Sequence, residues 1–319
     1  MLLVFPLSCA KTVPTKKRKK TAKIIIKKPA VEKILIKKKK RRKPQVEEEI
    51  IIEEPGPREK RAKRIERRKK IIPGLPAILP TYFNKKDSSD MAFVQGGYFI
   101  MGGNEGGKNE RPASEVHVPA FFIDIYEVTN TRYKLFNDEF ESTAAVDCDF
   151  CPVTGITWQE AESYCKWAGK RLPTEAEWEK TARGTQQLKW PWGNSPKKNT
   201  ANILENKEPQ SKAKHRTGPV PVGSFPRGVS IFGVFDMTGN VWEWTDSFYS
   251  PYKNNLDHDV RYQSQYRVLR GGSWENIPEN ARTTFRHPVP SDTRLPNIGF
   301  RCVKDADKST IQSIQPRNR

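Results

Sequence analysis

Two helices stand out in the pattern of apolar and polar positions along the chain. Thr157-Trp-Gln-Glu160 and Thr174-Glu-Ala-Glu177 are capping boxes, in which the threonine hydroxyl accepts from a backbone amide and the glutamate reaches back. They predict helices that run to about Ala168 and about Arg183, with Gly169 and Gly184 ending them. An apolar stripe on the first helix consists of Ala161, Tyr164 and Cys165.

Most other segments are short and interrupted by glycine and proline. Gly97–Met101 and Phe121–Glu127 have the composition of strands. The pattern therefore predicts a low content of regular secondary structure, with a few strands beside the two helices.

The first 80 residues differ from the rest of the chain. They hold 26 Lys and Arg against 8 Asp and Glu, which is nearly all of the net charge of +20, and all Trp and Tyr follow them. Such a segment cannot bury enough apolar surface to offset its chain entropy. We predict a disordered basic tether over residues 10–80, a hinge at Pro73-Gly-Leu-Pro76, and one folded domain over residues 81–319.

Within the tether, basic runs alternate with short aliphatic triplets such as Ile24–Ile26. A solvated spacer is the simpler interpretation. Binding to an anionic surface, whether phospholipid, lipopolysaccharide or nucleic acid, is the alternative. Pro14–Lys20 also has the composition of a nuclear-import patch, but such runs discriminate poorly, and nucleic acid is not favoured as a partner.

The first nine residues end in Leu7-Ser-Cys9 after an apolar run, which resembles the end of a bacterial lipoprotein signal with Cys9 as the acylated residue. A basic start is missing and the apolar run is short, so either the chain is truncated here or the match is accidental; we favour truncation. No run approaches the ~18 apolar residues of a membrane span. The prediction is a lipid-anchored protein of the bacterial cell envelope, facing the periplasm or the surface.

Four cysteines remain in the domain if Cys9 is acylated, an even number that suits an oxidising compartment. Cys148-Asp-Phe-Cys151 could be a small disulfide loop, half a zinc site or a redox pair. No second pair of ligands stands at zinc spacing, and no thioredoxin-like setting surrounds it. The disulfide loop is the preferred interpretation.

Several short motifs follow one another in a fixed order. They are Phe99–Gly102, Glu127–Asn130, Gly169–Glu179, Pro191–Gly193, Thr238–Trp244, Arg270–Trp274 and Gly299–Cys302. Together they resemble the formylglycine-generating enzyme family, the sulfatase-modifying factor domain, over roughly residues 91 to 304. The resemblance implies an α+β fold related to C-type lectins.

The resemblance pairs Cys165 with Cys302 in a disulfide, while Ala182 stands where a second family disulfide would have one partner. It also bears on the tryptophans, which could form a platform for stacking sugars or bases. In this fold they more plausibly fill the core, with indole nitrogens bonded to loop carbonyls. The residues concerned are Trp158, Trp178, Trp242 and Trp244.

The family block that matches Thr238–Trp244 binds Ca²⁺, so Asn240 and Glu243 are the candidate metal ligands. A second family site uses an Ala-Asn-Ile block, present as Ala201–Ile203. It makes Asn202 and Ile203 weaker candidates, because no Asp occurs in residues 204–223.

The family oxidases bind Cu(I) through two cysteines after the Gly-Gly-Ser block, since Cu(I) requires soft thiolates. Here Asn276 stands at the first position and Asn280 or Ala281 at the second, and no cysteine occurs between residues 166 and 301. The related iron enzymes of thiol-histidine biosynthesis need three clustered histidines, whereas the four here are scattered. We predict no copper and no formylglycine production, and consider catalysis the weakest alternative.

Two non-enzymatic functions from different classes remain. One is a lipid-anchored envelope scaffold or interaction protein, which the long charged tether slightly favours. The other is a ligand-binding surface protein like the variable proteins of diversity-generating retroelements, which also share this domain. Its binding face would consist of Asn276, Glu279, Arg282, Thr284, Arg286, His287, Asp292 and Arg294.

Overall fold

The computed structural model describes residues 81–141, 148–204, 218–262 and 265–312. Cys9, the signal-like residues 1–9 and the tether over residues 10–80 lie outside these ranges, so the predictions made for them stay untested. Among the described helices, none has the length and apolar character that crossing a membrane requires.

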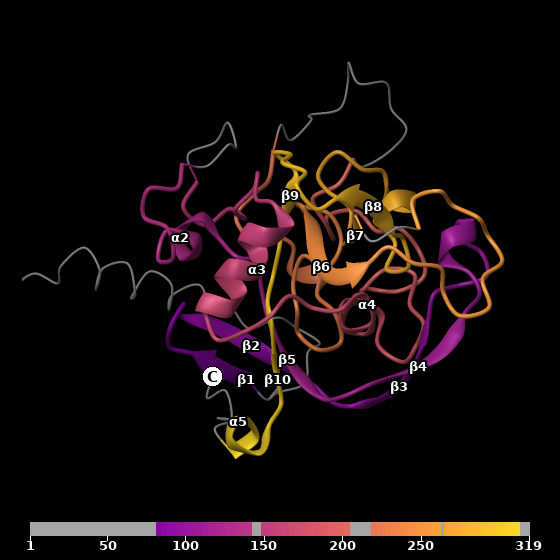
Figure 1. Cartoon of the computed structure of the whole chain (residues 1–319), viewed down its shortest axis with the longest axis horizontal. Helices are drawn as coiled ribbons and strands as arrows, with labels where there is room; N and C mark the ends of the chain where they lie inside the picture. Colours follow the sequence, from indigo (N-terminus) through magenta and orange to yellow (C-terminus); the bar gives the residue numbers. More distant parts are fainter. Residues whose placement is uncertain (1–80, 142–147, 205–217, 263–264, 313–319) are drawn as a thin grey trace, which may run out of the picture. The chain divides into compact units, whose positions relative to one another are not determined.

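The two ends of the described domain meet in one antiparallel sheet (Figure 1). Its strand order is β1-β2-β5-β10, and these strands span Thr81–Asn84, Ser89–Val94, Phe121–Asp124 and Val303–Asp305. β5 is buried along its whole length because it has a neighbour on both sides. The chain therefore closes on itself where the domain begins and ends.

A two-stranded ribbon extends from this sheet. β3 (Gly97–Met101) pairs with β4 (Ser114–Val118), and Phe99 and Val118 turn toward the interior. The loop between the strands carries a short 3₁₀ helix, η1 (Lys108–Glu110). The strand predicted at Gly97–Met101 is confirmed.

A second four-stranded sheet forms the other part of the domain (Figure 1). Its order is β8-β7-β6-β9, with bounds His287–Pro290, Tyr266–Arg270, Trp242–Phe248 and Ile298–Gly299. β9 runs parallel to β6, while the other pairs are antiparallel. Edge strand β8 holds Pro288 and Pro290, which lack the amide that a further strand would need.

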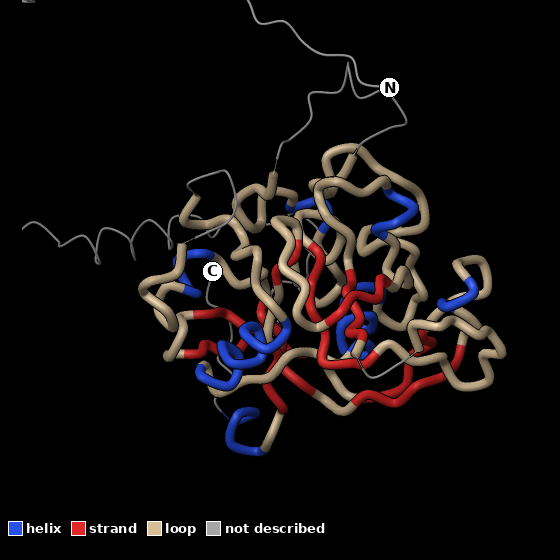
Figure 2. The backbone as a smooth tube through the Cα atoms, turned by 45° about the horizontal axis from the view of Figure 1, so that its top comes forward, coloured by secondary structure: helices blue, strands red, loops and turns tan. Residues whose placement is uncertain are grey.

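Both predicted helices are present with their capping boxes. α3 spans Trp158–Trp167 and α4 spans Glu175–Arg183, capped by Thr157 and Thr174. The remaining helical segments are short: α2 (Asn130–Tyr133), α5 (Lys308–Gln312), η2 (Pro226–Gly228) and η3 (Pro278–Ala281). Loops make up much of the domain, as the glycine and proline pattern predicts (Figure 2).

Two hydrophobic clusters fill the domain. One lies around α3, β6 and Phe300, and the other lies around α4, the first sheet and the ribbon. Trp158, Trp178, Trp242 and Trp244 are all buried, which confirms the core assignment. The indoles of Trp158 and Trp244 donate to the carbonyls of Thr245 and Ile156, but that of Trp178 donates to a carboxylate instead.

Both predicted disulfides are present. Cys165 on α3 is bonded to Cys302 at a sequence separation of 137, and Cys148 is bonded to Cys151. The first joins the helix to the chain segment before β10, deep in the core. In the chain-entropy model, closing so long a loop contributes about 5 kcal/mol.

The strand predicted over Phe121–Glu127 ends earlier, at Asp124. Beyond it the backbone leaves the sheet, and the Glu127 carboxylate accepts from the amides of Asn240 and Val241. Glu127 is fully buried, and these bonds satisfy its carboxylate, while the amides of Ile125 and Val128 donate to the carbonyls of Asp90 and Phe300.

Candidate functional site

The segment after β7, where the family resemblance would place the copper cysteines, forms a closed turn. The Asn276 Oδ1 accepts from the Ser273 amide and hydroxyl, both at 2.8 Å, and the Asn276 amide donates to the Ser273 carbonyl. Gly272 has φ of 75° and leaves no room for a Cβ, which would lie 2.7 Å from that of Ala281. Asn276 therefore stabilises the turn where an oxidase would hold a metal.

The turn has no thiolate partner elsewhere in the domain. The four cysteines of the described residues are consumed in the two disulfides. Cys9 is the fifth cysteine of the chain. The chemistry present around Ser273 consists of hydroxyl, amide and carboxylate groups, which are poor ligands for Cu(I).

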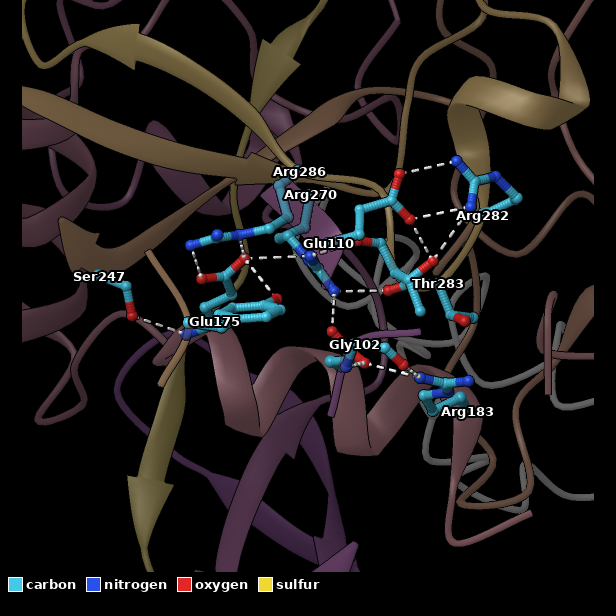
Figure 3. Close-up of polar contacts among 12 residues, drawn as sticks. Gly102, Glu110, Glu175, Arg183, Ser247, Arg270, Arg282, Thr283 and Arg286 are labelled. Carbon is cyan, nitrogen blue, oxygen red and sulfur yellow. Dashed lines mark hydrogen bonds and ion pairs between the residues drawn. The ribbon is translucent and has the colours of Figure 1, made fainter. Parts of the chain in front are cut away.

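Arg282, predicted on the exposed binding face, instead makes an ion pair with η1. Its two terminal nitrogens donate to the two Glu110 oxygens at 2.8 Å each, and Thr284 donates to the same carboxylate at 2.6 Å (Figure 3). Burial opposes ionisation of Glu110, but the hydrogen bonds from Arg282 and Thr284 outweigh it and lower its pKa. The contact fixes the β3–β4 loop against the C-terminal segment.

Arg286 lies deeper still. It is 3% exposed and donates to both oxygens of Glu175 at the start of α4, at 2.6 and 2.8 Å. Arg270 on β7 joins Glu175 to Glu179. Figure 3 shows Arg270 and Arg286 beside Glu175. Burial works against the charge on Glu175, yet Arg286 and Arg270 lower its pKa.

These contacts correct the predicted binding face. Arg286 and Thr284 belong to the interior, because their polar groups satisfy buried carboxylates, and Arg282 is mostly covered by its pairing with Glu110. His287 is half-buried and stacks on Trp242 with a centroid distance of 5.1 Å. Burial and the nearby Arg261 lower the pKa of His287.

The exposed part of the predicted face is smaller. Glu279 and Asp292 are open to solvent, and Asn276 is half-buried. The Arg294 side chain is 53% exposed and bonds to Glu160 of α3 at 2.6 Å. We call Glu279, Asp292 and Arg294 the rim: Glu279 follows the Ser273 turn in sequence, and Asn297, three residues after Arg294, donates to the Ser273 hydroxyl.

Candidate ligands of the two predicted calcium sites lie close together, although the sequence assigns them to separate sites. Asn202 bridges to Gly239 and donates to the Asn240 Oδ1, which also accepts from the Val220 amide. Ile203 lies against Gly239. Asn202, Ile203 and Asn240 therefore lie together at the Gly239 turn.

The oxygen atoms of this turn are already engaged. Both Glu243 oxygens accept from Arg301 at 2.7 Å, and one accepts from the Trp178 indole as well. An oxygen cage for Ca²⁺ needs carboxylate oxygens free of a competing cation. The Glu243 carboxylate therefore does not fit Ca²⁺, while Asn240 stays a candidate ligand on the family resemblance alone.

Two further buried carboxylates near Arg301 were not predicted as site residues from the sequence. Burial, together with Asp236 and Glu243, raises the pKa of Glu127 well above its usual value. Burial raises the pKa of Asp236 to about 6, against the hydrogen bond from the Gly223 amide. Glu127 opens one of the family-like blocks and Asp236 precedes another, which was the available signal.

The chain is similar in sequence to known proteins. A model of the sulfatase-modifying factor enzyme 1-like domain matches residues 78–306. The serine/threonine-protein kinase Pkn1 of Chlamydia trachomatis serovar L2 is 34% identical over 248 residues, which are 68% of this chain and 38% of that protein. The inactive C-alpha-formylglycine-generating enzyme 2 of Mus musculus is 32% identical over 277 residues, covering 68% of this chain and 86% of the relative.

The fold and the site define a domain of the formylglycine-generating-enzyme type. The chain belongs to the sulfatase-modifying factor enzyme 1-like family. Among solved structures, Treponema denticola variable protein 1 shares the fold with a TM-score of 0.59 at 21% identity, covering 72% of this chain and all of that one. The chain spans only 38% of the chlamydial kinase it matches, whose name describes a longer protein.

Proposed function

We propose that this protein is a non-catalytic member of its family that binds a partner at the bacterial cell envelope. The observation that carries the proposal is the Ser273 turn, where Asn276 makes structural hydrogen bonds at the position of the first copper cysteine. The relative from Mus musculus that is named as inactive shows that the family includes members without the oxidase reaction.

The exposed rim around that turn is the proposed partner-binding surface. Glu279, Asp292 and Arg294 present charge of both signs, while Arg282 and Arg286 hold the loops below them in place. Loops fixed on a rigid scaffold bind with little loss of conformational freedom. A protein partner with a mixed polar surface suits this rim.

Acylation at Cys9 and the basic tether would place the domain at the envelope, where the tether adds attraction to anionic lipid. The alternative function is a ligand-binding variable surface protein. It would use the same rim, because the C-terminal segment that displays binding residues in those proteins would correspond to Arg270–Arg301 here.

Copper competition tests the non-catalytic proposal directly. Full-length protein is titrated against a Cu(I) chelator, in parallel with an Asn276→Ser variant and with a family oxidase that has both cysteines. We expect wild type and variant to leave the chelator saturated while the oxidase removes copper from it. Removal of copper by wild type but not by Cys9→Ser would locate the copper on Cys9, and removal by both would contradict the proposal.

Membrane fractionation tests the anchor separately. In a bacterial host, Cys9→Ser should move the protein from the membrane fraction to the soluble fraction. Identical fractionation of wild type and variant would reject acylation at Cys9 and leave the copper result unaffected.

A further inference from the structure

In the loop after β6, large apolar side chains face the solvent. In Tyr249–Tyr262, Leu256 is 87% exposed and Val260 is 82% exposed, the highest values among the large apolar side chains of the described residues. Phe248, at the end of β6, is 46% exposed beside them in sequence. Aliphatic side chains presented this fully on one loop indicate a surface that another apolar phase covers.

The loop is held firmly from below. The Asn255 side-chain amide donates to the carbonyls of Lys108 and Arg111 at 2.8 and 2.6 Å, which ties the loop to η1. Tyr252 lies under the Arg286 guanidinium, 4.1 Å from its ring centroid. Because the polar side chains are used for anchoring, the aliphatic ones are left facing outward.

The charges around the loop are arranged in two layers. Asp257 and Asp259 are set back, with side-chain exposures of 25% and 12%, and Asp259 accepts from the Tyr249 hydroxyl. Their cationic partners stand further out, since Lys108 is 83% exposed and Arg261 is 45% exposed. Lys253 is exposed on the same loop. The outermost charges are therefore positive.

We infer that this loop is a membrane-docking element that inserts Leu256 and Val260 among the acyl chains of an anionic bilayer. Two protruding aliphatic side chains enter a soft apolar phase without needing a matching pocket, and the cations beside them meet the lipid phosphates. The element is independent of acylation at Cys9 and of the rim around Ser273. It would fix which side of the domain faces the membrane.

Vesicle binding tests this inference. Full-length protein carrying Cys9→Ser, which removes any acyl anchor, is mixed with vesicles of phosphatidylcholine and phosphatidylglycerol. It is compared with the same protein carrying Leu256→Asp and Val260→Asp. Leu135→Asp serves as the matched control, because Leu135 is also exposed, at 54%, but lies in another loop. Binding is measured in low salt and at about 0.5 M salt, where charges on the tether are screened.

At high salt we expect the double variant to bind about tenfold more weakly than the parent, or worse, because two apolar insertions are lost. Leu135→Asp should bind like the parent. Equal binding of the parent and the double variant in both salts would overturn the inference, as would an equal loss in the Leu135→Asp control. A circular dichroism spectrum shared by all three proteins excludes misfolding as the cause.

Discussion

Arg301 and Glu243 form a fully buried pair, in which two guanidinium nitrogens donate to the two carboxylate oxygens at 2.7 Å each. Arg301 also donates to the carbonyls of Asp124, Ile125 and Phe235, so it connects the first sheet to the turn that carries Asn240. The position that family resemblance assigns to a metal ligand is thus occupied by a salt bridge.

Glu243→Gln should lower the free energy of unfolding by about 3 kcal/mol, because it leaves the Arg301 charge without its closest partner. Denaturant unfolding measures the loss, which should be the same with calcium and with chelator. Glu162→Gln, which breaks an exposed pair with Lys166, should cost less than about 0.5 kcal/mol. A loss that appears only when calcium is present would instead establish Glu243 as a metal ligand.

Asp236 should make part of the stability depend on pH. Its pKa is raised to about 6 in the folded protein from an ordinary 3.8, so folding favours the protonated form. Its contribution is present below about pH 4 and is lost as the pH rises through 6, by up to about 3 kcal/mol. As the pH rises from 4 to 6, Asp236→Asn should therefore become more stable relative to wild type. Above pH 6 the difference in stability between the two proteins should stay constant. A difference between the two proteins that does not change with pH would contradict this expectation.

The two disulfides should differ in their effect on stability. Replacing Cys165 and Cys302 by serine should cost about 5 kcal/mol, and replacing Cys148 and Cys151 about 2 kcal/mol, because the second closes only a four-residue loop. Thermal unfolding of the two double variants checks the order. A larger loss for the short loop would mean that Cys148–Cys151 holds structure beyond its own loop.

Substitutions of Arg282 and Arg294 should have different effects, on stability for Arg282 and on partner binding for Arg294. Arg282→Ala removes two bonds to buried Glu110 and should cost about 2 kcal/mol in unfolding free energy. Arg294→Ala touches an exposed pair and should change stability by less than about 0.5 kcal/mol. If the rim binds a partner, Arg294→Glu should weaken capture without unfolding the domain. Equal stability losses in the two alanine variants would contradict this division of roles.

Local signals in the sequence were sufficient for some of the fold. The capping boxes at Thr157 and Thr174 lie within one helical turn, so they fix where α3 and α4 begin. The strand at Gly97–Met101 follows from its own composition. The strand predicted over Phe121–Glu127 instead ends at Asp124, and Glu127 beyond it contacts Asn240, which is distant in sequence. Secondary-structure propensity is a local property, so it cannot predict a contact with a residue 113 positions away.

The burial of Arg282 and Arg286 could not be predicted for the same reason. Arginines in a C-terminal segment look like surface residues, and their burial depends on carboxylates from elsewhere in the chain. Glu110 lies 172 residues before Arg282, and Glu175 lies 111 before Arg286. Cysteine pairing was predictable because the resemblance supplied the long-range contact between Cys165 and Cys302.

A Ser273 turn without thiolates should not oxidise a substrate cysteine. The most direct measurement is mass spectrometry of a Cys-x-Pro-x-Arg peptide incubated with the full-length protein, copper and oxygen, beside a no-protein control and a family oxidase with both cysteines. We predict no formylglycine above the no-protein control while the oxidase converts the peptide. Repeated turnover to formylglycine by this protein would contradict the claim.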